Sequence, residues 1–201
     1  MSYIIDLVFP TAIYKNNIGT LSKEQYEFVV GQEYSKRITG TYGRDDTRVL
    51  ENELFKTLKD KILTEVNFFA KDIYKYVDIE FYITHSWLNH NPKNSYHNAH
   101  RHSNSVFSGA YYINVPENCP GLYFHSSNSR MFEMKVSEGN LINANSWRMP
   151  VSSGDLIIFP STLTHEVPEN YGDNDRYTLA FNTFIRGSIG SEGADNYVIL
   201  S

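Results

Sequence analysis

The spacing of hydrophobic residues along the chain changes from a helical period to a strand period near residue 79. Between residues 54 and 77, apolar side chains recur every three or four positions, which predicts a core-facing amphipathic helix. From residue 79 the period is two, which indicates a half-buried strand. One face of this strand is expected to carry Ile79, Phe81, Ile83, His85 and Trp87.

Two weaker elements are predicted before the helix. Residues 4–14 are rich in β-formers, but Pro10 limits them to an edge strand or a pair of short strands. Residues 21–34 predict a short helix, in which Ser22 is the N-cap and Glu24 and Gln25 lie near the first turn.

Further short strands are predicted over residues 106–115, 121–125, 155–159, 164–167 and 176–185, each bounded by Gly, Pro or Asn. This order predicts a mainly β fold with α, an antiparallel double sheet or jelly roll buttressed by N-terminal helices. We expect one domain over residues 1–201. Its parts would be N-terminal strands and helices (1–78), a jelly-roll core (79–187) and a tail (188–201) whose last apolar residues dock onto the body.

The composition agrees with such a fold and narrows the partners. Of the 201 residues, 41% are hydrophobic and 14% aromatic, which favours a single β-rich core. The net charge of -5, with scattered Lys and Arg, gives no strong signal for nucleic acid. No segment has the length and apolarity of a membrane span or a signal peptide, so we expect a soluble, cytoplasmic protein. Oligomeric state is not encoded in any motif, and a homodimer is compatible with the sequence.

Histidine is the residue type that could carry chemistry. Cys119 is the only cysteine, so a metal site would have to use His, Asp or Glu. If His100 and His102 lie on one strand, two positions apart, both imidazoles point to the same face and could share one ion. His165, on a later strand, is the best third ligand, whereas Glu166 has the opposite parity. The remaining strand histidines, interpreted as hydrogen-bonded or surface residues, are His85, His90 and His125.

A second polar pattern opens the strand predicted at 176–185. Arg176, Thr178, Ala180 and Asn182 are expected to share one face. A guanidinium inside a barrel stays charged and needs an anion, and a dicarboxylate would meet that need through two parallel hydrogen bonds. The Thr178 hydroxyl could add a third bond, and the Tyr112 phenol could approach from a neighbouring strand. The alternative for Arg176 is a surface salt bridge at a strand edge.

Four motifs occur in a fixed order that resembles a known family. They are H-x-H at 100–102, N-S-x-x-S-G-x-Y-Y at 104–112, G-D-L-I-I-F-P-S-x-L-x-H-x-V at 154–167 and R-x-T-L-A-F-N at 176–182. Together they resemble the iron(II)- and 2-oxoglutarate-dependent oxygenases, in particular a branch common in bacteria and phages. The resemblance runs from about residue 87 to residue 185, roughly half of the chain.

The resemblance implies a double-stranded β-helix, iron(II) as metal and 2-oxoglutarate as cosubstrate. The implied iron ligands are His100, His102 and His165, and the implied 2-oxoglutarate anchors are Arg176, Thr178 and Tyr112. His97 is a reserve ligand if the strand register differs. The implied activity is a dioxygenase that hydroxylates an unidentified substrate with release of succinate and CO2, with ascorbate as a compatible reductant. A phage-encoded protein would act in the host cytoplasm.

One position departs from the wider superfamily, whose usual ligands are two His and one carboxylate. His102 stands where Asp or Glu is expected. Three neutral imidazoles leave the iron at 2+, and metal binding should depend on pH because each imidazole must lose its proton. Three-His iron is also the pattern of cupin-type dioxygenases that need no 2-oxoglutarate, although Arg176 weighs against that alternative. A non-catalytic jelly-roll binding protein and a structural phage protein are the remaining alternatives.

The substrate is not identified by any motif, and both small molecules and macromolecules stay open. Residues 126–150 form a long polar segment that could be a lid or a solvated connection. The residues considered as substrate or lid contacts are Trp87, Asn89, Arg130, Trp147 and Arg148.

Overall fold

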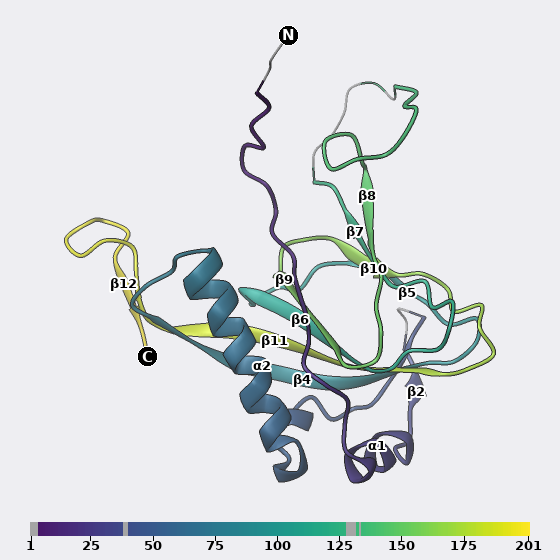
Figure 1. The fold of residues 1–201 in the computed structure, drawn as a ribbon. Coiled ribbons are helices and arrows are strands. Elements are labelled where there is room, and N and C mark those ends of the chain that lie inside the picture. Colours follow the sequence, from purple (N-terminus) through teal and green to yellow (C-terminus); the bar gives the residue numbers. More distant parts are fainter. Residues whose placement is uncertain (1–3, 38–39, 128–131, 133) are drawn as a thin grey trace.

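The structure is a computed structural model that describes residues 4–37, 40–127, 132 and 134–201. Its strands form two antiparallel sheets that pack face to face as a jelly roll (Figure 1). The larger sheet consists of β1 (Tyr14–Asn17), β2 (Ser35–Lys36), β3 (Tyr42–Gly43), β4 (Ile79–Asn91), β6 (Phe107–Asn114), β9 (Asp155–Pro160), β11 (Arg176–Ile189) and β12 (Val198–Leu200). The smaller sheet consists of β5 (His97–His100), β7 (Leu122–His125), β8 (Ser146–Met149) and β10 (His165–Val167). The fold class predicted from the sequence is therefore confirmed.

Strand order follows the jelly-roll pattern, in which neighbours in space are distant in sequence. The larger sheet has the order β1-β9-β6-β11-β4-β3-β2, with β12 paired to β11, and the smaller sheet has the order β5-β10-β7-β8. The tail thus returns to the body as a strand, since Ser188 pairs with Ile199. None of the helices in the described ranges is long and apolar enough to cross a membrane.

Two helices and the short 3-10 turns Val49–Glu51 and Glu53–Phe55 lie in the N-terminal part of the chain, before the long strand β4. Helix α1 (Lys23–Val30) begins with a capping box, in which the Ser22 hydroxyl accepts from the Gln25 backbone and the Gln25 side chain accepts from the Ser22 backbone. Helix α2 (Lys56–Phe68) lies across the larger sheet and continues into a π-helical turn (Phe69–Ile73) (Figure 1).

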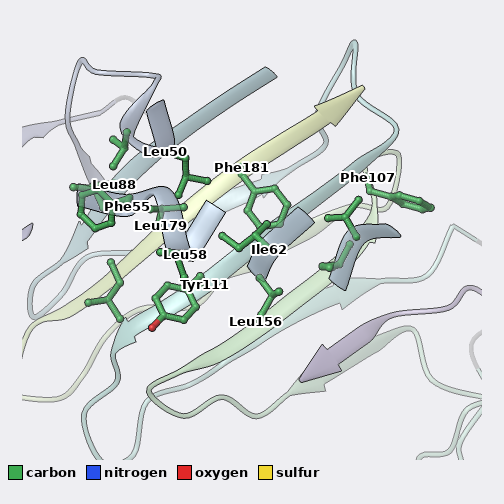
Figure 2. Packing of buried hydrophobic residues seen from close by; sticks show 14 of the residues in the cluster. Leu50, Phe55, Leu58, Ile62, Leu88, Phe107, Tyr111, Leu156, Leu179 and Phe181 are labelled. Carbon is green, nitrogen blue, oxygen red and sulfur yellow. The ribbon is translucent and has the colours of Figure 1, made fainter. Parts of the chain in front are cut away.

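Alternation along the central strands divides the larger sheet into two faces. The face toward the helices carries a large apolar core, to which α2 contributes Leu58, Ile62 and Val66 (Figure 2). Tyr111 and Phe181 belong to this core. The opposite face meets the smaller sheet through a second apolar cluster, formed by Tyr112, Leu122, Phe124, Ile157 and Phe159. The strand positions between the core residues therefore point into the space between the sheets.

The prediction of an N-terminal strand over residues 4–14 is wrong for most of that range. Residues 4–13 form no strand, and β1 begins only at Tyr14. Phe9 has a positive φ of 59° and is followed by Pro10, which together interrupt an extended strand. Apolar β-formers alone do not make a strand where the backbone cannot pair.

The amphipathic stripe of residues 54–77 is core-facing only up to Phe69. Ile73 and Val77 are 51% and 72% exposed. Ile73 ends the π-helical turn at Phe69–Ile73, whose wider turn rotates side chains away from the stripe, and Val77 lies beyond the end of the helix.

The prediction of which β4 residues share a face is also wrong for the residues that follow Ile83. Asn182 of β11 pairs with His85, whereas Thr183 pairs with Ile83, so one extra residue of β4 forms a bulge. Ile83 packs on the helix-side core, and after the bulge Leu88 takes this side. Trp87 therefore faces the space between the sheets, and His85 is exposed. The bulge turns this end of β4 toward the candidate site.

Candidate metal centre

Three histidines, two from the smaller sheet and one from the loop after β5, come together. One ring nitrogen from each of His100, His102 and His165 lies within 4.8 Å of the others. His100 ends β5 and pairs directly with His165 of β10. The prediction that His100 and His102 lie on one strand is wrong, because β5 ends at His100. His102 is held instead by its backbone N–H, which donates to the Ser161 carbonyl at 3.0 Å.

Each of the three imidazoles is held through its Nδ1 atom by a hydrogen-bond acceptor. His102 Nδ1 lies 2.6 Å from the Asn182 side-chain oxygen. His100 Nδ1 lies 2.7 Å from the Asn98 carbonyl, and His165 Nδ1 lies 3.0 Å from the Leu163 carbonyl. Carbonyl oxygens only accept, so each Nδ1 carries the proton and each Nε2 keeps a lone pair. Three Nε2 lone pairs in one cluster make a ligand set for a metal ion.

Burial favours the neutral, metal-binding form of these rings. Burial, together with the neighbouring His100 and His102, lowers the pKa of His165 to about 3, against the opposing effect of its hydrogen bond to Leu163. Burial also lowers the pKa of His102, against the opposing effect of its hydrogen bond to Asn182. His102 Nε2 is buried without a hydrogen-bond partner, so a bound metal ion would satisfy this atom. The three residues therefore fit a divalent metal.

The reserve ligand His97 lies beside the three-nitrogen cluster and outside it. Its ring stacks on His100 with 4.1 Å between the centroids, and burial lowers the pKa of His97 to about 3. Glu166 points away from the cluster, since its carboxylate lies 3.4 Å from His125 Nε2. The nearest acidic residue in sequence therefore takes no place among the three imidazoles.

A small pocket of about 50 Å³ adjoins the histidines, and Arg176 forms part of its wall. The Arg176 side chain is only 1% exposed, so it is not a surface residue at a strand edge. Its Nη1 donates to Cys119 Sγ at 3.2 Å, while its Nε atom is buried without a hydrogen-bond partner. No carboxylate of the described residues forms an ion pair with Arg176. A buried guanidinium with a thiol as its side-chain partner can accept an anion from outside.

Thr178 and Tyr112 line the same pocket beside Arg176. Thr178 pairs with Tyr112 across β11 and β6, which brings the two hydroxyl-bearing side chains next to each other. Burial raises the pKa of Tyr112, so its phenol stays protonated and can donate a hydrogen bond. The face predicted for Arg176, Thr178, Ala180 and Asn182 is thus present in the structure, where the first three line the pocket and Asn182 contacts His102.

The residues considered as substrate contacts separate into two groups. Trp87 and Asn89 line the metal pocket, and the Trp87 ring stacks on His102 with 5.7 Å between centroids. Trp147 is 41% exposed and lines a different groove beside the N-terminal segment. Arg148 donates to the carbonyls of Pro120 and Cys119, at 2.8 and 3.2 Å. Arg130 lies outside the described residues.

The histidines interpreted as structural lie in ordinary environments. His90 stacks on Tyr177 at 4.6 Å between centroids, and its Nε2 lies 2.9 Å from an Asp175 oxygen.

Sequence reasoning did not assign Asn182 a role at the metal site, although its parity with Arg176 placed it on the correct face. Strands β5 and β8 were also missed, because neither has an alternating apolar pattern.

The chain is similar to known 2OG-Fe(II) oxygenases in sequence and in fold. Residues 85–182 match the family described as "Putative 2OG-Fe(II) oxygenase". This segment contains the three histidines, Arg176 and Asn182. Among proteins with curated descriptions, none matches this sequence.

Solved structures of the same fold include two prolyl hydroxylases and a protein with bound 2-oxoglutarate. A Pseudomonas putida prolyl-4-hydroxylase aligns with a TM-score of 0.54 and 12% identity, over 86% of this chain and 92% of that chain. A Trichoplax adhaerens prolyl hydroxylase, in complex with a hypoxia inducible factor peptide fragment, has a TM-score of 0.57 and 15% identity, over 86% and 79%. HygX from Streptomyces hygroscopicus, with nickel and 2-oxoglutarate bound, has a TM-score of 0.57 and 14% identity, over 86% and 82%.

Proposed function

This chain is a 2OG-Fe(II) oxygenase that uses iron(II) and 2-oxoglutarate, and on that premise we propose that it hydroxylates a C–H bond of its substrate with release of succinate and CO2. When bound, the iron supplies the oxidative chemistry, with 2-oxoglutarate as the source of two electrons. The chain's own residues bind the two components, fix their orientation and keep water out. The fold alone does not define a substrate.

The proposed metal ligands are the Nε2 atoms of His100, His102 and His165. This assignment rests on the hydrogen bond that each Nδ1 atom makes, which leaves Nε2 free for a metal. The acceptors are the Asn98 carbonyl for His100, the Asn182 side chain for His102 and the Leu163 carbonyl for His165. These bonds fix both the tautomer and the ring plane before any metal arrives. The imidazole of His102 takes the position where the wider superfamily has a carboxylate, so the ligand set carries no negative charge.

The proposed anchor for the distal carboxylate of 2-oxoglutarate is Arg176, supported by Thr178 and Tyr112. The guanidinium supplies a fixed positive charge, and the two hydroxyls can donate to the same carboxylate. The pocket would thus offer a dicarboxylate two positive groups, a metal ion held by the three histidines and the guanidinium of Arg176. Leu122 and Phe159 supply apolar wall between them, which limits water around the bound cosubstrate.

Arg176 also favours this proposal over the alternative of a three-His dioxygenase that needs no 2-oxoglutarate. The buried guanidinium, whose Nε atom lacks a partner, matches the distal carboxylate of 2-oxoglutarate, a cosubstrate that such an enzyme does not bind. Burial of an unmatched charge costs several kcal/mol in effective terms, which favours a built site for an anion. A non-catalytic jelly roll would likewise leave both the three lone pairs and the guanidinium without a role.

The test is the conversion of labelled 2-oxoglutarate to labelled succinate by the pure protein with iron(II) and ascorbate. We expect slow succinate formation without added substrate in the wild type and none above background in Arg176→Ala. Arg186→Ala is the matched control, because Arg186 lies on the same strand but is exposed and contacts Tyr82. Equal rates in the wild type and Arg176→Ala would contradict the proposed role of Arg176.

A further inference from the structure

A polar groove adjoins the metal pocket, and we call it the rim groove. Trp87, Asn89 and His97 line both hollows, so the two are continuous along β4 and β5. The rim groove has a volume of about 330 Å³, against about 50 Å³ for the metal pocket. Because the metal pocket has little room beyond the cosubstrate, a substrate that reaches the metal needs the space of the rim groove.

The outer wall of the rim groove carries two guanidinium groups, those of Arg37 and Arg44. Arg44 lies over the Phe28 ring at 5.7 Å from its centroid, which restrains the guanidinium. Arg37 lies over Gly43 of β3, where a Cβ atom would come within 2.8 Å of Arg37 Nε. The glycine therefore gives Arg37 the room to lie across the strand and face the groove.

The charges of these two arginines are only loosely compensated. Arg44 Nη1 is buried without a hydrogen-bond partner, and its nearest carboxylate is Asp46, with 3.5 Å between Nη1 and Oδ2. Arg37 Nη2 donates at 2.8 Å to Asp45, a residue that is almost fully exposed. Exposed ion pairs contribute at most about 1 kcal/mol, so a ligand anion can replace the exposed Asp45 carboxylate at low cost.

Arg44 Nη1 belongs to a small group of buried nitrogens without hydrogen-bond partners. Two others, His102 Nε2 and Arg176 Nε, are explained by the metal and the cosubstrate of the proposed function. Two more, on His90 and His125, lie beside carboxylates of other strands or loops. Arg44 Nη1 also lies beside a carboxylate, that of Asp46, but among these atoms it is the one whose residue lines the rim groove, where a ligand anion would give it the hydrogen bond that it lacks.

We propose that the rim groove binds the substrate through an anionic oxygen group, a carboxylate or a phosphate, held by Arg44 with Arg37 beside it. The rest of the substrate would extend past Trp87 and His97 toward the metal pocket, an orientation that rests on the proposed function. A guanidinium binds such groups through two parallel hydrogen bonds. A neutral amide of the same shape offers one acceptor oxygen and no negative charge, so it cannot form the two charge-assisted bonds and the groove selects acids over amides.

The test measures binding to protein loaded with zinc(II), which has no redox chemistry, and saturated with 2-oxoglutarate. Three probes are titrated by calorimetry: N-benzoylglycine, its amide, and phenyl phosphate. We expect at least one of the two anions to bind at least tenfold more tightly than the amide, and the ratio of the two identifies carboxylate or phosphate as the preferred group. Arg44→Gln should weaken the preferred anion at least tenfold with unchanged affinity for 2-oxoglutarate, whereas Arg186→Gln should change neither.

A second variant makes the test independent of any folding defect in Arg44→Gln. Asp46→Asn removes the carboxylate that competes for Arg44, so it should tighten binding of the preferred anion. The proposal is overturned if neither anion is preferred over the amide, if Arg44→Gln binds the anion as the wild type does, or if Asp46→Asn fails to tighten binding. Failure of 2-oxoglutarate itself to bind would instead contradict the proposed function, so the two failures are distinguishable.

Discussion

His102 Nδ1 lies 2.6 Å from Asn182 Oδ1, although the two residues are 80 positions apart in the sequence. The same oxygen accepts a hydrogen bond from the Ser108 hydroxyl at 2.7 Å. Two donors on one oxygen fix the orientation of the Asn182 amide, and the amide in turn fixes the His102 ring. This contact links the central strand β11 to the loop that follows β5.

Asn182→Ala should therefore weaken metal binding by roughly 10- to 100-fold, the usual effect of losing the hydrogen bond behind a metal-ligating histidine. Competition with a chelating dye under anaerobic conditions measures the affinity. Asn182→Asp keeps an acceptor oxygen and should retain most of the affinity. If Asn182→Ala binds metal as well as the wild type, the bond to His102 does not support the metal centre.

Arg176→Met should separate cosubstrate binding from stability. Loss of charge-assisted hydrogen bonds to a carboxylate should lower 2-oxoglutarate affinity roughly 100-fold, which corresponds to about 3 kcal/mol. Without cosubstrate, the thermal midpoint should not fall, because the variant removes a buried charge that has no carboxylate partner. Calorimetry and thermal unfolding measure the two effects. A large loss of stability with unchanged 2-oxoglutarate affinity would assign Arg176 a structural role only.

Gly109→Ala should destabilise the protein by about 1–3 kcal/mol through overpacking. An added Cβ atom would lie 2.3 Å from the Phe181 ring and 2.7 Å from the Ile157 carbonyl. Gly139→Ala is the control, since nothing lies within 4 Å of its Cβ position. Urea unfolding compares the two variants, and equal free energies of unfolding would show that β6 and β11 can separate without cost.

Asp155 should make stability depend on pH at the β1–β9 edge. Burial alone would raise the pKa of Asp155, but the ion pair with Lys15 and the hydrogen bonds from Asn17 and Ser152 lower it. Because the folded pKa lies below the unfolded value, the stabilisation is complete above the unfolded pKa of about 4 and is lost as pH falls through the folded pKa.

Asp155→Asn should thus lower the free energy of unfolding at pH 7 by about 1–3 kcal/mol, the range for a hydrogen-bonded charged group. The difference from the wild type should shrink as pH falls below about 4. Asp60→Asn, at an exposed ion pair with Lys56, is the control that should show little change. A difference between wild type and Asp155→Asn that stays constant down to pH 2 would exclude this pH dependence.

Motifs that lie far apart in the sequence made the grouping of the three histidines predictable, whereas the local strand pattern around His100 and His102 did not. His165 and Arg176 were identifiable because each stands at a fixed place in a β-pattern that survives in β10 and β11. The argument for His100 and His102 predicted the observed grouping of histidines from a wrong premise, since His102 lies beyond β5 and is placed by Ser161. Contacts between distant segments decided this position, and strand parity carries no information about them.

Irregular backbone explains the other differences. The bulge in β4 moved Trp87 to the face opposite to the one its parity predicted. The π-helical turn exposed Ile73, although its spacing fits the stripe. Both features insert one residue into a regular repeat, and hydrophobic periodicity does not reveal such insertions.

Anaerobic titration of iron(II) in the presence of 2-oxoglutarate tests the joint binding of metal and cosubstrate most directly. The wild type should bind one equivalent of iron(II) and develop the visible absorption band of a 2-oxo acid chelated to iron(II). His102→Ala should lose the band through loss of a ligand, and Arg176→Met should need a far higher 2-oxoglutarate concentration to reach it. Iron(II) bound by the wild type without this band, or an unchanged band in His102→Ala, would contradict the account.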